Sequence, residues 1–187
     1  MSIADKILRA KADYDAVYEA GKASGGGSHT SCFDGTFEGE FVDNDILSLK
    51  YGAFAGCSQI TKIDLPNCTK VGGNYAFYNA TAVEIILLPS VTSGSFGAVF
   101  YGCSNVKTID LRSLGGAVFE SNAFRGCGKL EKLILGGNTI CTFTGSNYLS
   151  GVPTSMTVYV PESLVGTYQG TSPWSQYEIK PISALEG

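Results

Sequence analysis

The sequence predicts a mainly β protein with short helical parts, whose chain coils as a solenoid behind an N-terminal α-helix. One aromatic position recurs every 23 or 24 residues, at Phe54, Phe77, Phe100 and Phe124. Leu149 takes the same place in a fifth copy. The 24 glycines and the ten residues each of Tyr and Phe suit strands joined by tight turns. Because periods of this length are typical of solenoids, we expect about five turns of ~23 residues.

Residues 1–24 are predicted to form an amphipathic helix. Apolar positions separated alternately by four and three residues make a heptad seam of Ile3, Ile7, Ala10, Tyr14 and Val17. A Gly/Ser-rich linker, residues 25–34, separates this seam from the rest of the chain, so we expect the helix to mediate homo-oligomerisation. A trimer would suit a fibre-like part, although the seam does not fix the number. The alternative is that the helix caps the solenoid or docks on another protein.

Residues 35–161 are predicted to form the solenoid, with one short strand in each turn. Nine and eleven residues after each recurring position stand aliphatic residues, as in Ile63-Asp64-Leu65. This alternation indicates a strand whose two aliphatic residues point inward. Strands of adjacent turns lie about 4.8 Å apart, so each inward residue stacks on its copy in the next turn. Phe100 is accordingly expected in the core.

Four strand positions that should point outward carry apolar side chains, namely Ile85, Leu87, Ile134 and Tyr159. A cluster of exposed apolar side chains usually marks an interface, so these four are the candidate partner-binding residues. The alternative is that the C-terminal tail or a neighbouring loop covers them.

The cysteines are predicted to be mostly free thiols. Cys57, Cys103 and Cys127 share one repeat position and therefore form one ladder. Ladder members two turns apart are too distant for a disulfide, and the Cβ vectors of adjacent members run parallel. We expect these three to be buried thiols that act as small apolar residues. The ladder argument leaves open the states of the other three, Cys32, Cys68 and Cys141, and a disulfide of Cys68 is one alternative.

Charge and composition argue against catalysis. The net charge is −4, and the single histidine, His29, stands in the linker, where no rigid scaffold holds it. Asp64 and Asp110 lie two turns apart on one face, but surface charges explain them more simply than an acid–base pair. We expect no catalytic residue, metal site or cofactor. The acidic composition argues against nucleic-acid binding, and the longest apolar run, residues 85–88, is too short for membrane insertion.

The repeat unit resembles a known family. Residues 53–66 read Ala-Phe-Ala-Gly-Cys-Ser-Gln-Ile-Thr-Lys-Ile-Asp-Leu-Pro, and residues 99–111 and 123–135 follow the same pattern. This unit is similar to the BspA-like leucine-rich repeat, and the resemblance implies a leucine-rich-repeat solenoid. Residues 158–177 resemble the C-terminal cap of such proteins in phages and prophages of gut bacteria, which makes residues 162–187 a cap. Residues 11–21 resemble N-terminal segments of phage tail-associated proteins.

These resemblances imply binding and assembly. The expected function is that of a non-catalytic phage virion component, in the tail, a fibre or another external part. Its repeat surface would contact other virion proteins, or a protein or glycan of the host surface. The protein would be made in the bacterial cytoplasm and located in the virion. The alternative is a bacterial cell-surface adhesin of the BspA-like type, against which the lack of an export signal argues.

Overall fold

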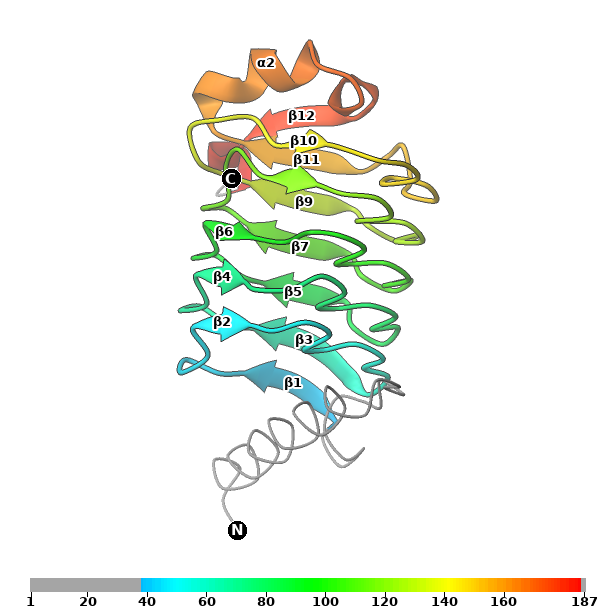
Figure 1. The fold of residues 1–187 in the computed structure, drawn as a ribbon. Helices are drawn as coiled ribbons and strands as arrows, with labels where there is room; N and C mark the ends of the chain where they lie inside the picture. The colour runs from blue at the N-terminus through cyan, green and yellow to red at the C-terminus, as the bar shows by residue number, and fades with distance from the viewer. Residues whose placement is uncertain (1–37, 186–187) are drawn as a thin grey trace.

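The computed structural model describes residues 38–185 of the 187-residue chain. They form a mostly β solenoid of about six turns with one short α-helix, which confirms the predicted fold class and adds a turn to the expected five (Figure 1). The predicted helix of residues 1–24 and the linker of residues 25–34 lie outside the described residues. The same holds for the proposed oligomerisation residues and two others, Ile3, Ile7, Ala10, Tyr14, Val17, His29 and Cys32.

A seven-stranded parallel sheet, here called the main sheet, runs along the solenoid with its strands stacked one above another (Figure 1). In sheet order, the strands are β1 (Gly39–Val42), β3 (Ile60–Asp64), β5 (Ile85–Leu87), β7 (Thr108–Leu111), β9 (Lys132–Leu135), β11 (Thr157–Val160) and β12 (Glu178–Pro181). The inward residue Ile86 pairs in register with Ile63 on one side and Ile109 on the other, as the repeat predicts. Strands β1 and β12 lie outside the five copies that the sequence analysis recognised.

Shorter strands carry the chain back in the opposite direction (Figure 1). β2 (Ser48–Leu49), β4 (Lys70–Val71) and β6 (Ser93–Gly94) form one parallel sheet. β8 (Val118–Phe119) and β10 (Thr142–Phe143) form another. Loops that contain the recurring phenylalanines then lead from each short strand into the next strand of the main sheet.

The recurring phenylalanines form a continuous stack in the core. The ring centroids of Phe54 and Phe77 are 5.5 Å apart, those of Phe77 and Phe100 are 5.4 Å apart, and those of Phe100 and Phe124 are 5.3 Å apart. All four side chains are at most 2% exposed, and Phe100 is completely buried, as expected. Each ring therefore fills its own turn and packs on the turns above and below it.

Two cysteines of the ladder donate hydrogen bonds to the preceding turn. The Cys103 thiol donates to the Phe77 carbonyl oxygen at 3.0 Å, and the Cys127 thiol donates to the Phe100 carbonyl oxygen at 3.1 Å. Burial raises the pKa of the Cys103 thiol to about 12 and also raises the pKa of Cys127 well above its ordinary value. Both thiols are free, as predicted. The repeat thus uses cysteine as a small apolar residue that also satisfies a buried carbonyl.

The prediction of a free thiol is wrong for Cys57, which is disulfide-bonded. Cys57 is the first member of the ladder and has Ala80 as its copy in the next turn, so the argument from parallel cysteine neighbours does not constrain it. Cys68 and Cys141, whose states the sequence left open, are both free and buried. The alternative of a Cys68 disulfide is therefore not realised.

The C-terminal segment covers the last turn of the solenoid. It contains η1 (Glu162–Leu164), α2 (Val165–Gln169), η2 (Trp174–Gln176) and, after β12, η3 (Ile182–Leu185). Trp174 donates through Nε1 to the Cys141 carbonyl oxygen at 2.7 Å, and the Tyr168 hydroxyl accepts from the Cys141 amide at 2.9 Å. These two buried aromatic residues satisfy backbone groups that the final turn would otherwise leave without partners. No helix among residues 38–185 has the length and apolar character needed to cross a membrane.

Candidate functional site

The outward side chains of the main sheet form one surface, which we call the outer sheet face. Parallel pairing in register arranges them in two columns, with one residue from each strand in each column. The first column consists of Glu40, Lys62, Ile85, Thr108, Lys132, Thr157 and Glu178. The second consists of Val42, Asp64, Leu87, Asp110, Ile134, Tyr159 and Lys180. All four predicted partner-binding residues belong to this face.

Charged residues mark the end of this face at β1 and β3. The Lys62 ammonium lies 3.2 Å from a Glu40 carboxylate oxygen on the neighbouring strand and 3.7 Å from an Asp64 oxygen on its own strand. Val42, beside Asp64 in the second column, is 47% exposed. Partly exposed ion pairs of this kind contribute little to folding stability, so these charges are better suited to orienting a partner.

Ile85 and Leu87 of β5 form the apolar centre of the exposed part of the face. Both are half-buried, which agrees with the expectation that they point outward. Lys62 and Asp64 adjoin them on β3. Next to Ile85 in the chain, Glu84 forms an ion pair with Lys107 at 2.7 Å. That pairing lowers the pKa of Glu84 and raises the pKa of Lys107, so both side chains stay charged at neutral pH.

The expectation that Ile134 and Tyr159 are exposed is wrong. They occupy outward positions on β9 and β11, yet Ile134 is 4% exposed and Tyr159 is 9% exposed. In Figure 1 the chain turns back after β12, and η3 reaches the level of β11. This course favours the alternative that the C-terminal tail covers these two residues. Of the four candidates, Ile85 and Leu87 are therefore the accessible ones.

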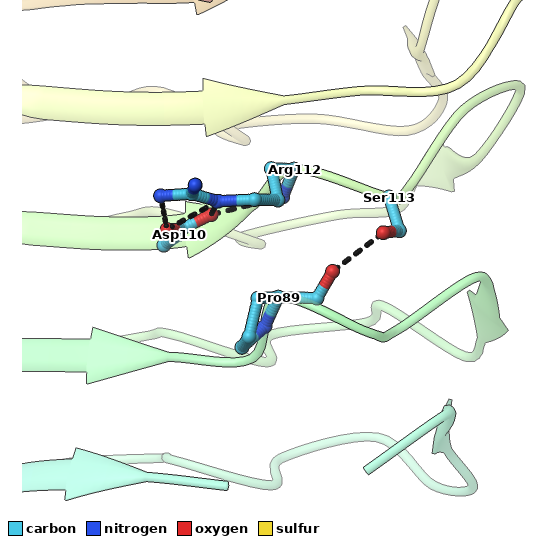
Figure 2. Close-up of polar contacts among 4 residues, drawn as sticks. All are labelled: Pro89, Asp110, Arg112 and Ser113. Carbon is cyan, nitrogen blue, oxygen red and sulfur yellow. Dashed lines mark hydrogen bonds and ion pairs between the residues drawn. The ribbon is translucent and has the colours of Figure 1, made fainter. Parts of the chain in front are cut away.

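Asp110, beside Leu87 in the second column, forms a two-point ion pair with Arg112 (Figure 2). The Arg112 Nε lies 3.1 Å and 2.9 Å from the two carboxylate oxygens, and the Arg112 amide donates to Oδ1 at 3.0 Å. The Asp110 side chain is only 5% exposed, whereas the Arg112 side chain is 49% exposed. A buried carboxylate needs such a partner, and the guanidinium then offers its outer side to solvent.

The ion pairs also show how Asp64 and Asp110, the two aspartates of the sequence analysis, are placed. In the second column, Leu87 stands between Asp64 and Asp110, and each carboxylate has its own cation. We interpreted Asp64 and Asp110 as surface charges from the sequence. Asp110 differs from that expectation because it is buried. At the far end, Glu178 pairs with Lys180 at 3.0 Å and accepts a hydrogen bond from Thr157 at 2.9 Å. All four carboxylates of the outer sheet face thus form ion pairs.

Sequence reasoning missed the ends of this surface. Glu40 and Val42 belong to β1, and Glu178 and Lys180 belong to β12, and neither strand follows a loop with the recurring aromatic residue. One signal was present in the sequence, because Phe41 precedes Ile63 by nearly one repeat length and pairs with it. No group of three or more His, Cys, Asp or Glu side chains suited to a metal ion occurs within residues 38–185. Chemically, the face offers ion pairing, hydrogen bonding and a small apolar contact.

Comparison with known proteins identifies the repeat. Residues 30–159, well over half of the chain, match a family model described as a BspA-type leucine-rich repeat region, in six copies. Six copies agree with the about six turns of the solenoid. No curated protein and no solved structure shows significant similarity to the chain.

Proposed function

Because the chain belongs to the BspA-type leucine-rich repeat family, we propose that it is a repeat protein for protein binding or adhesion, and that its outer sheet face contacts the partner. The observation that carries this proposal is the half-exposed pair Ile85 and Leu87, set among ion-paired charges. Protein interfaces typically combine an apolar centre with a polar rim. The pairing of every carboxylate on the face supports a binding role over acid–base catalysis.

The setting proposed for this binding is the outside of a phage virion, in the tail, a fibre or another external part. The resemblances of residues 11–21 and 158–177 to phage proteins support it. The partner would be another virion protein, or a protein or glycan of the host surface, and the chain would be made in the bacterial cytoplasm. A bacterial cell-surface adhesin is the second candidate, because BspA-like repeats are also found there. Mass spectrometry of purified particles and of washed envelopes separates the two, since the protein should be enriched in only one fraction.

Self-association is the second part of this proposal. The seam of Ile3, Ile7, Ala10, Tyr14 and Val17 would bring several solenoids together, as a trimer in a fibre-like part. Several weak sites on one particle bind a repetitive surface far more tightly than one site does. Light scattering should find a larger particle for the full chain than for a chain that begins at Gly25. Equal monomers would contradict oligomerisation through the helix.

Binding through the outer sheet face can be tested with two double variants of the full chain. Ile85→Asp with Leu87→Asp places two charges on the apolar centre. Thr92→Asp with Ser95→Asp adds the same charge at exposed positions between β5 and β7, away from the face. Flow cytometry of labelled protein on intact cells of the native bacterial source should show about tenfold weaker binding for the first variant only. Equal binding by both variants and the unaltered chain would contradict the use of this face.

A further inference from the structure

A row of aromatic side chains lies away from the outer sheet face, on the loops that lead into the main strands. Tyr78 follows Phe77, Tyr101 follows Phe100 and Arg125 follows Phe124, so the three occupy one repeat position in successive turns. The rings of Tyr78 and Tyr101 stack with centroids 4.9 Å apart, and the Arg125 guanidinium lies 5.6 Å from the Tyr101 centroid. Tyr75 packs edge-on against Tyr78 at 5.4 Å. We call Tyr75, Tyr78, Tyr101 and Arg125 the tyrosine ridge.

The backbone conformation of Tyr75 is unfavourable for a bulky residue. Its φ is +61°, in the left-handed region that side chains with a Cβ rarely adopt. The equivalent position, two residues before the recurring core residue, carries Gly52, Ala98, Asn122 and Asn147 in the other turns, all with positive φ. Glycine and asparagine suit this conformation much better than tyrosine does. The contacts of the Tyr75 ring with Tyr51 and Tyr78 offset part of this cost, but its side chain is still 37% exposed, and an exposed tyrosine in such a conformation is expected to serve a further purpose.

The packing of the ridge determines which chemistry it presents. The faces of an aromatic ring are electronegative and its edge is electropositive. Stacking places the faces of Tyr78 and Tyr101 against each other, and the Arg125 cation lies over Tyr101. Besides the aromatic surface of Tyr75, which also packs on Tyr51 at 5.3 Å, the ridge presents ring edges, phenol hydroxyls and a guanidinium. All of these favour negative charge, and none of the four side chains is acidic.

The same packing argues against a sugar as the ligand. Sugar rings bind to aromatic residues mainly through the ring faces, and the stack with Arg125 takes up those of Tyr101 and one face of Tyr78. Rigid tyrosines together with arginine are instead enriched among the residues that dominate protein–protein interfaces. The backbone that carries them is fixed, because the Tyr75 amide donates to the Gly97 carbonyl oxygen at 3.0 Å and the Tyr78 amide donates to the Tyr75 carbonyl oxygen at 3.0 Å. The backbone of the ridge therefore loses little conformational entropy when a partner binds.

We infer that the tyrosine ridge is a second docking surface, separate from the outer sheet face, and that it binds a protein segment that combines carboxylate and aliphatic side chains. The carboxylates contact Arg125 and the phenol hydroxyls, and the aliphatic groups cover the ring edges. Tyr75 widens the apolar contact beside Tyr78 in the same turn, and its unfavourable backbone conformation is retained for this contact.

The test uses the full chain and three labelled peptides of equal length, in which leucine alternates with glutamate, lysine or serine. Fluorescence anisotropy should show at least about tenfold tighter binding of the glutamate peptide than of the other two. Tyr75→Asn and Arg125→Gln should each weaken this binding about tenfold. Lys70→Gln removes the same charge at an exposed position of β4, outside both proposed surfaces, and should leave the binding unchanged. Tyr75→Asn should not lower the thermal midpoint, because Asn122 and Asn147 already occupy the equivalent backbone conformation.

Three results would overturn the inference. Peptide binding that does not depend on composition would remove the preference for carboxylates. Full binding by Tyr75→Asn, or an equal loss in Lys70→Gln and Arg125→Gln, would show that the ridge is not the site. Binding of 3′-sialyllactose that Arg125→Gln abolishes, without a preference among the peptides, would make the ligand a carboxylated sugar instead of a protein segment.

Discussion

Replacement of Phe100 by alanine tests whether the stacked phenylalanines hold the solenoid together. The side chain is completely buried and lies between Phe77 and Phe124, with ring centroids 5.4 Å and 5.3 Å away. Loss of a buried phenylalanine costs about 3–5 kcal/mol, which includes the cavity that alanine leaves. The two ring contacts are worth about 0.5–1.5 kcal/mol each within that loss. We therefore expect the free energy of unfolding to fall by about 4–5 kcal/mol.

Urea denaturation followed by far-UV circular dichroism measures this change, and Trp174 fluorescence reports separately on the C-terminal end. The control is Val118→Ala, because Val118 is 46% exposed and its truncation should cost no more than about 0.5 kcal/mol. An unchanged denaturant slope would show that the same surface is exposed on unfolding. A loss below about 1 kcal/mol for Phe100→Ala would refute the assignment of Phe100 to the core stack.

Three further predictions follow from the buried thiols and the C-terminal segment. In native protein at pH 8, Cys103 and Cys127 should not react with Ellman's reagent, whereas both should react after unfolding without a reductant. Rapid reaction of these two thiols in the native protein would contradict their burial. Burial raises the folded pKa of Cys103 from 9.0 to about 12, so between these values the unfolded chain releases a proton that the folded chain keeps. Stability should therefore be complete below pH 9 and fall as the pH rises further, and the double variant Cys103→Ala with Cys127→Ala should show a shallower fall in urea midpoints. Trp174→Phe removes the hydrogen bond to the buried Cys141 carbonyl and should lower the free energy of unfolding by about 1–3 kcal/mol. An unchanged thermal midpoint would show that this hydrogen bond does not hold the C-terminal segment in place.

The repeat made the five central strands of the main sheet predictable but not its first strand, β1, or its last, β12. Spacing and alternation placed the inward residues of β3, β5, β7, β9 and β11, since these strands repeat one pattern. In β1 the pattern breaks at Asp43, which follows the strand where Leu65 follows β3. The Asp43 side chain accepts hydrogen bonds from the amides of Asp45 and Ile46, so it stabilises a local turn instead of filling the core.

The sequence predicted which way the side chains of the candidate site point, but not how far each of them is exposed. Alternation along a strand shows which way Ile134 and Tyr159 point, but not whether a later part of the chain lies over them. The tyrosine ridge escaped notice for a different reason. Repeat analysis selects positions that are alike in every turn, and the position after the recurring phenylalanine varies from Ala55 to Tyr78 and Arg125. Features that distinguish one turn from another are thus found in the packing of side chains in the structure and not in the repeat period of the sequence.

The stack of phenylalanines has a consequence for how such a protein changes length. Because Phe77, Phe100 and Phe124 present nearly parallel rings at almost equal distances, any one of them can meet any other across the boundary between two turns. An in-frame loss or duplication of one whole turn would preserve every type of contact at the new junction. It would shorten or lengthen the molecule by about 4.8 Å. Unequal recombination between copies could therefore change the reach of the protein and the number of side chains in the ridge in small steps, without a new core having to evolve.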